Sequence, residues 1–122
     1  MVDKKIESIK KNLVILFDEV MVKEGQYSMP YSSRSDDYAD WSVTYKIDKV
    51  NLHNVTRYKR CQYGGTIYLE LIEIKVGHQG DWEYVKYISD LPSWIEDDIK
   101  DSILDEVETW LPNVCVDVDF SY

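Results

Sequence analysis

Acidic side chains recur along a late segment of the chain at spacings that place them on one side of a helix. Asp97, Asp101, Asp105 and Glu108 are three or four residues apart, so at about 100° per residue they share an arc of roughly 80°, with Asp98 beside them. Like charges at these spacings destabilise a helix. Two interpretations follow: an ordinary solvated face, or a negative ridge that docks onto a basic surface of a target protein in the manner of nucleic-acid phosphates.

Trp94 bears on the choice between these interpretations. Its helical angle places it on the acidic side of the helix rather than with Ile95 and Ile99. A tryptophan ringed by carboxylates suits an interface anchor, although at the first turn it could equally fold back over a sheet edge. The predicted partner-binding residues are Trp94 and five acidic residues. We call these five the acidic ridge: Asp97, Asp98, Asp101, Asp105 and Glu108.

A second cluster combines basic and aromatic side chains: Arg57, Tyr58, Lys59, Arg60 and Tyr63. Such surfaces stack bases and hold phosphates, but the net charge of −9 disfavours direct binding of nucleic acid. The cluster would also suit the acidic helix of a second copy, which would make a homodimer.

The alternative function uses this cluster together with a tyrosine-rich segment at residues 24–40. That segment lacks an apolar period and is expected to form a long loop, which in a small domain is either mobile or functional. With Arg57, Lys59 and Arg60 it could bind a small ligand or a nucleotide in a pocket lined by Tyr27, Tyr31 or Tyr38.

A third reading is enzymatic. Glu73-Ile74-Lys75, with Asp48, Glu70 or Glu7 as an earlier acid, is similar to the Asp…Glu-x-Lys arrangement of Mg²⁺-dependent nucleases. Glu-x-Lys also arises by chance in a chain with 30% charged residues. The other common catalytic, cofactor and metal-binding motifs are missing from the sequence, so we expect a non-catalytic protein without cofactor or metal.

The cysteines and the N-terminus predict the cellular setting. Cys61 and Cys115 are too few for a disulfide framework, so we expect two free thiols. The first residues lack the apolar region of a secretory signal, and the apolar run at 13–17 is too short to span a bilayer. These observations predict a cytoplasmic protein that makes no membrane contact.

The composition fits one folded domain over residues 1–122. Hydrophobic residues make up 44% of the chain and aromatic residues 13%, enough to fill a core. The charge is uneven, since residues 90–122 carry one basic and ten acidic side chains. The acidic character is therefore concentrated in the segment that bears the acidic ridge.

The apolar pattern along the chain predicts an α+β fold. We expect an N-terminal helix at about 4–23 that stops near Gly25, an antiparallel four-stranded meander, a second helix, and a C-terminal strand. The expected strands lie at 41–48, 55–63, 66–76 and 82–88, with a hairpin turn at Gly64-Gly65 and a reversal at 77–80. Ile67, Leu69 and Leu71 alternate in one phase, and Ile72, Ile74 and Val76 alternate in the other. This slip predicts either a strand buried on both faces or a bulge.

The second helix is expected at 94–110, with Ser93 and Glu96 as a capping box. Its buried face should consist of Ile95, Ile99, Ile103, Val107 and Trp110. Alternating valines at 114–118 and Phe120 predict a last strand that rejoins the sheet.

Overall fold

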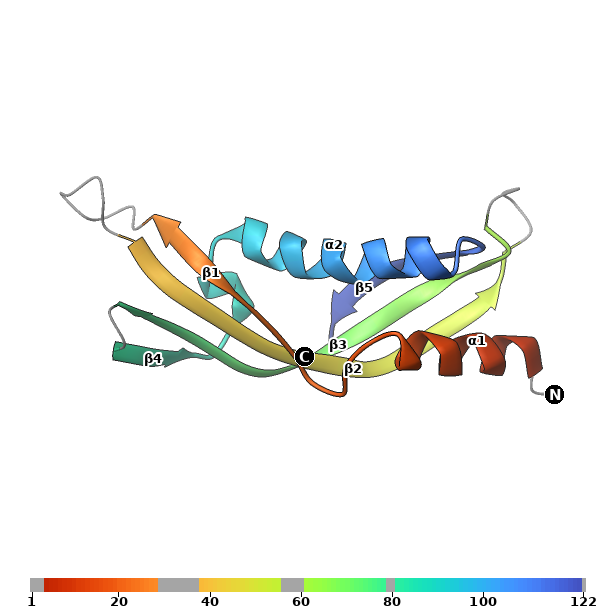
Figure 1. Ribbon diagram of the computed structural model, residues 1–122, viewed down its shortest axis with the longest axis horizontal. Coiled ribbons are helices and arrows are strands. Elements are labelled where there is room, and N and C mark those ends of the chain that lie inside the picture. The colour runs from red at the N-terminus through yellow and green to blue at the C-terminus, as the bar shows by residue number, and fades with distance from the viewer. Residues whose placement is uncertain (1–3, 29–37, 56–60, 79–80, 122) are drawn as a thin grey trace.

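The computed structural model describes residues 4–28, 38–55, 61–78 and 81–121. Its fold is α+β, as the sequence predicts: a helix, four antiparallel strands, a second helix and a last strand (Figure 1). The elements are α1 (Lys4–Ile15), β1 (Met21–Ser28), β2 (Tyr38–Asn54), β3 (Tyr63–His78), β4 (Asp81–Val85), the 3₁₀ helix η1 (Ile88–Asp90), α2 (Ser93–Trp110) and β5 (Val114–Phe120).

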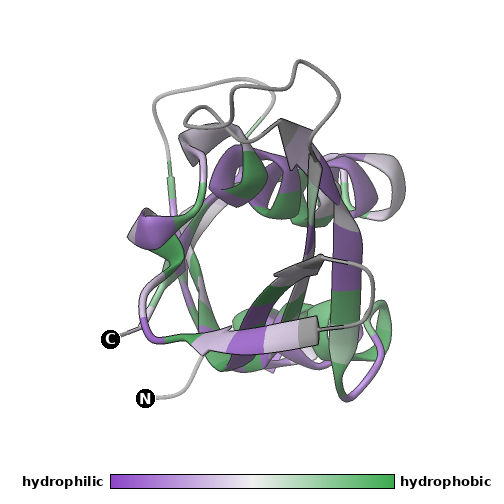
Figure 2. Cartoon of the chain, turned by 90° about the vertical axis from the view of Figure 1, so that its left-hand side faces the viewer, coloured by the Kyte–Doolittle hydropathy of each residue, from purple (hydrophilic) through white to green (hydrophobic). Residues whose placement is uncertain are grey.

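The four strands β1 to β4 form an antiparallel meander, and β5 joins it in parallel beside β3. One edge of β3 pairs with β2 along nearly its whole length. The other edge is shared, because β5 pairs with Tyr63–Leu69 and β4 pairs with Ile74–His78. Seen end on, the sheet curls around the interior and α2 closes it (Figure 2). One side of α2 therefore packs on the inner side of the sheet, and its other side faces solvent.

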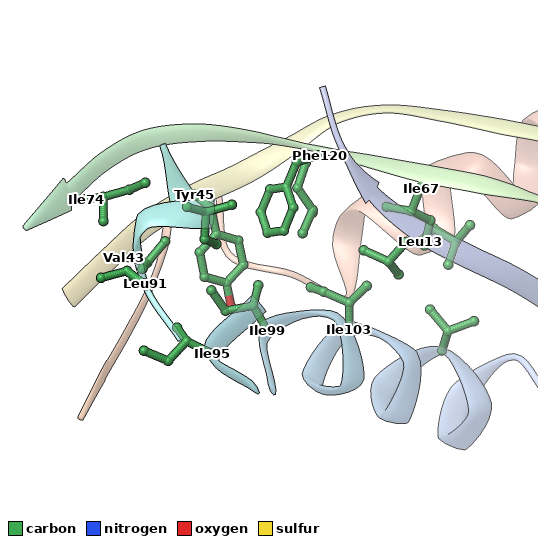
Figure 3. Close-up of a cluster of buried hydrophobic side chains, with 14 of the residues drawn as sticks. Leu13, Val43, Tyr45, Ile67, Ile74, Leu91, Ile95, Ile99, Ile103 and Phe120 are labelled. Carbon is green, nitrogen blue, oxygen red and sulfur yellow. The ribbon is translucent and has the colours of Figure 1, made fainter. Parts of the chain in front are cut away.

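The core lies between the curved sheet and the two helices. Ile95, Ile99 and Ile103 of α2 are at most 1% exposed, since a spacing of four residues keeps them on one face. They meet side chains of β2 and β3, and Leu13 extends the core beneath α1 (Figure 3). The predicted buried face of α2 is confirmed except at Trp110, which is 64% exposed at the last residue of the helix.

The first helix is shorter than its apolar period predicts. It ends at Ile15, and the chain continues as β1, whose Met21 pairs with Tyr45 of β2. Pairing with β2 satisfies the backbone of β1 and overrides the local helical pattern. Gly25 is not a helix stop but lies inside β1, where a Cβ would stand 3.1 Å from the ring of Trp41.

The predicted loop at 24–40 is wrong at both of its ends. Residues 24–28 belong to β1 and residues 38–40 belong to β2, and the two strands pair as far as Ser28 and Tyr38. The remainder of the segment lies outside the described residues. The segment was predicted to be a loop because it is polar and lacks apolar alternation. Its two ends form strands nevertheless, because they pair with each other across the sheet.

The predicted hairpin turn at Gly64-Gly65 is also wrong, since both glycines lie inside β3 between β2 and β5. Gly65 has a φ of 149°, and a Cβ there would stand 1.9 Å from the carbonyl oxygen of Asn51. Glycine is required here by a close approach of two backbones. Tyr63 and the segment 66–76 are consequently parts of one strand, and the reversal predicted at 77–80 does separate β3 from β4.

The slip of alternation in β3 is a bulge, one of the two predicted explanations. Thr44 pairs with Glu73 but Tyr45 pairs with Leu71, so Ile72 is the additional residue on β3. Ile72 is 49% exposed, whereas Ile74 returns to the core. The bulge thus resets which residues of β3 face α2.

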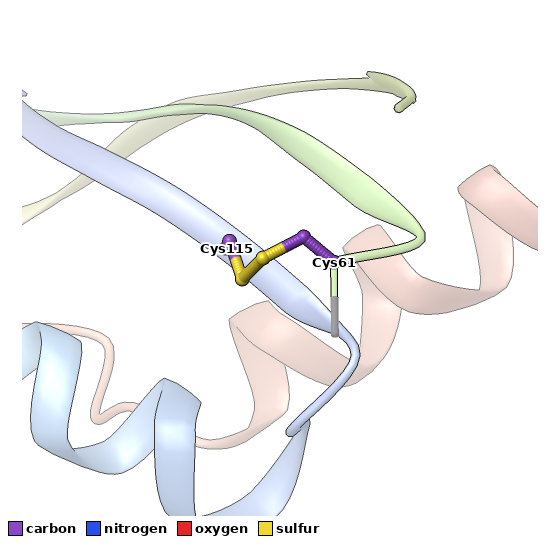
Figure 4. The surroundings of a disulfide bond; sticks show 2 residues. All are labelled: Cys61 and Cys115. Atoms are coloured by element: carbon purple, nitrogen blue, oxygen red, sulfur yellow. A yellow bond between two sulfur atoms is a disulfide. The ribbon is translucent and has the colours of Figure 1, made fainter. Parts of the chain in front are cut away.

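Cys61 and Cys115 form a disulfide rather than two free thiols (Figure 4). The parallel pairing of β3 with β5 places Cys115 opposite Gly64, and the Cα atoms of the two cysteines are 5.5 Å apart. The sequence could not reveal this, because 54 residues separate the partners and only the topology joins them. The bond ties β5 to the start of β3.

Candidate functional site: the acidic face of the second helix

The acidic ridge lies along the solvent side of α2. Its five carboxylates are exposed, because the isoleucines on the opposite side of the helix fix that side against the sheet. The helix begins at Ser93 with Pro92 as its N-cap, and no side-chain capping bond forms there among the described residues, so the predicted capping box is wrong. Glu96 pairs instead with Lys100, at 3.3 Å between Oε1 and Nζ.

Lys23 is a basic side chain close to the acidic ridge, but the structure shows it bonded to other groups. Lys23 of β1 reaches α2, where its Nζ donates to the carbonyl oxygen of Asp98 at 3.2 Å and contacts Ser102 Oγ at 2.5 Å. It therefore bonds to the backbone and a hydroxyl. Within the described part of the chain, none of the three ion pairs involves a ridge carboxylate. The ridge is thus a row of negative charge open to a partner.

Trp94 packs back against the sheet, as one of its two predicted arrangements requires, and keeps part of its ring exposed. Its ring packs edge-on against Trp41 of β2, with centroids 6.1 Å apart and planes at 78°. Trp41 is 2% exposed, and the space for its ring comes from the absence of a side chain at Gly25. Trp94 nevertheless remains 43% exposed beside the acids. A fixed aromatic with nearly half its surface open suits a contact residue.

The structure adds features that the sequence analysis missed. Lys23 was assigned to a helix, and its contact with α2 depends on the pairing of β1 with β2.

Next to the C-terminal half of α2, an open groove of about 730 Å³ separates the helix from β5. Leu104, Val107 and Glu108 line it on the helix side, and Val116 lines it on the strand side.

Most of the basic and aromatic cluster lies outside the described residues, at Arg57, Tyr58, Lys59 and Arg60. The Gly64-Gly65 turn that was predicted to join their strand to the next one is part of β3. Tyr63 is itself 6% exposed and belongs to the core.

The tyrosines proposed for a ligand pocket are only partly described. Tyr27 is half-buried and packs against the core, Tyr38 begins β2, and Tyr31 is not among the described residues. No group of these tyrosines faces a common hollow in the part of the chain that the structure describes.

The residues of the nuclease reading take part in other contacts. Lys75 Nζ lies 4.8 Å from the ring centroid of Trp82, and Glu70 Oε2 pairs with Lys46 Nζ at 3.3 Å. Asp48 accepts a hydrogen bond from Ser121 Oγ at 2.9 Å. Across residues 4–28, 38–55, 61–78 and 81–121, no three His, Cys, Asp or Glu side chains are grouped to hold a metal ion.

No protein-family model, no curated protein and no solved structure matches the chain. Among the described residues, neither helix combines the length and the apolar character that crossing a membrane requires.

Proposed function

We propose that this chain is a non-catalytic binding protein, of the inhibitor, antagonist or immunity type, that docks the acidic ridge onto a basic surface of a target protein. One observation carries the proposal. Five exposed carboxylates without ion-pair partners among the described residues lie along one well-anchored helix, next to a partly exposed tryptophan.

The field of the ridge supports long-range attraction of a basic partner. The helix is held by a core of isoleucines, so the carboxylates are already in place before binding. A regular row of negative charge of this kind presents a basic surface with an arrangement similar to a phosphate backbone. Attraction between such surfaces raises the association rate and selects the partner.

Trp94 supplies the desolvated contact that charge alone does not provide. Carboxylates on an interface rim contribute mainly to the rate and specificity of association, whereas a buried aromatic contributes to the lifetime of the complex. Because Trp41 supports one edge of its ring, Trp94 loses little rotational freedom on binding. The two parts of the site therefore have separable effects.

The experiment is affinity capture from a lysate of the source cells, with the captured protein identified by mass spectrometry. Wild type is compared with the variant Asp97→Lys/Asp101→Lys/Asp105→Lys. A matched control reverses three other exposed acids, in Glu19→Lys/Glu24→Lys/Glu83→Lys.

We expect wild type and the control to capture the same protein at low salt and to release it at high salt. The ridge variant should miss it. Equal capture by the ridge variant would show that the acidic face is solvated surface and would end the proposal.

A further inference from the structure

The outer edge of β5 has backbone N–H and C=O groups that pair with no other strand among the described residues. Among the described residues β5 pairs with β3 alone. Ser121 N donates to Leu69 O at 2.8 Å and Tyr63 N donates to Asn113 O at 3.2 Å, so odd-numbered residues of this segment face β3. The even-numbered residues consequently point their N–H and C=O groups away from the sheet.

Both ends of this outward edge are satisfied within the chain. Val114 N donates to Leu111 O at 3.0 Å, and Phe120 N donates to Asp119 Oδ1 at 2.9 Å. In the middle of the edge, the backbone groups of half-buried Val116 and of Val118, which is 7% exposed, form no outward hydrogen bond among the described residues. Two residues with outward donors and acceptors provide four hydrogen bonds for an added strand.

The open edge adjoins the groove between β5 and α2. Leu104, Val107 and Val116 give the groove apolar walls, and Glu108 of the acidic ridge stands on its rim. Asp117 of β5 is exposed on the face of the strand opposite to Val116. An extended segment that paired with β5 could thus place alternate side chains in an apolar hollow and direct the others toward carboxylates.

We propose that this edge groove binds an extended, basic segment of the target protein by strand addition to β5. The inference rests on the proposed function and deepens it, because it names the kind of segment that the acidic surface recognises. Backbone bonds to Val116 and Val118 supply register, apolar side chains fill the groove, and the alternate lysine or arginine side chains lie on the other face beside Asp117.

A second copy of the chain fits this edge poorly. Antiparallel pairing of two β5 strands through Val116 and Val118 would set Asp117 directly opposite Asp117 of the other copy. Like charges in directly opposed cross-strand positions are destabilising. The surrounding segment 90–122, with one basic and ten acidic side chains, strengthens the repulsion. A basic occupant removes this conflict.

The test uses a fluorescein-labelled heptapeptide of alternating lysine and valine as the probe. Its binding to wild-type protein is measured by fluorescence anisotropy at low salt. The control peptide has the same sequence with every backbone amide N-methylated, which keeps the charges and removes the strand donors. We expect the N-methylated peptide to bind roughly tenfold more weakly or worse.

Hydrogen exchange measured by NMR locates the bound peptide. The amides of Val116 and Val118 should exchange rapidly in the unbound protein and become protected when the unmodified peptide is added. Val116→Pro, which lacks the amide proton, should lose the affinity. If the proline variant does not fold, the affinities of the unmodified and N-methylated peptides for the wild-type protein still test strand addition.

The outcomes separate the groove from the ridge. Equal affinity for both peptides, or no protection at Val116 and Val118, overturns strand addition and leaves the acidic-ridge proposal intact. Failure of the Asp97→Lys/Asp101→Lys/Asp105→Lys variant to affect capture of the target would instead overturn the ridge, whatever the peptide does.

Discussion

Replacing Asp101 should stabilise the fold while it weakens binding. Asp101 lies four residues from Asp97 and Asp105 and three from Asp98, so it takes part in three like-charge pairs on α2. Each such pair costs a helix about 0.2–0.5 kcal/mol, which sums to roughly 0.6–1.5 kcal/mol for Asp101→Asn. Asp101→Lys also turns the repulsions into attractions, and the gain in the free energy of unfolding should reach about 1–2.5 kcal/mol.

Urea unfolding followed by tryptophan fluorescence measures this gain, with Glu83→Lys on β4 as the control for net charge. The gain should shrink at high salt, because exposed charges are screened. A gain in stability joined to a loss of binding is the pattern of a surface kept for function at the expense of the fold. If Asp101→Lys left stability unchanged or lowered it at low salt, the reasoning about uncompensated charge on α2 would be refuted.

Three further predictions concern the fold that supports the site. Replacing Cys61 and Cys115 with serine should lower the free energy of unfolding by about 4 kcal/mol, because the disulfide closes a loop with a sequence separation of 54. Urea titration measures this loss, and an unchanged midpoint would show that the bond does not form. Gly65→Ala should cost roughly 3 kcal/mol or more in the same assay, because the added Cβ meets Asn51 O; a loss below 1 kcal/mol would contradict the close approach. Burial raises the pKa of Tyr45 above its ordinary value of 10.0, so the neutral side chain contributes fully to the free energy of unfolding below about pH 10 and loses this contribution as pH rises through the folded-state pKa. Tyr45→Phe should therefore lose less stability at alkaline pH in urea titrations. An identical loss of stability in both proteins would contradict this prediction.

The sequence predicted the elements whose patterns are local and regular. The four-residue spacing of Ile95, Ile99 and Ile103 identified both the extent of α2 and its buried side, and the acidic side followed by geometry. The phase slip around Ile72 likewise indicated an irregular strand, with a bulge as one of two explanations, since it records which side chains face the core. In each case a few neighbouring residues carry the information.

Errors arose where distant segments decide the structure. Gly64 and Gly65 have the sequence of a hairpin turn, yet Asn51 on a neighbouring strand sets their surroundings. The disulfide between Cys61 and Cys115 depends on a parallel pairing that follows only from the complete topology. The edge groove was equally invisible, because it requires β5 and α2 to be placed side by side.

The most direct test of the central claim is the dissociation constant of the captured, purified target for wild type and for Asp97→Lys/Asp101→Lys/Asp105→Lys at low salt. We predict that the reversal weakens binding by roughly 100-fold or more, and that high salt weakens the wild-type complex far more than it weakens that of the variant. Equal dissociation constants for the two proteins at low salt would contradict the account.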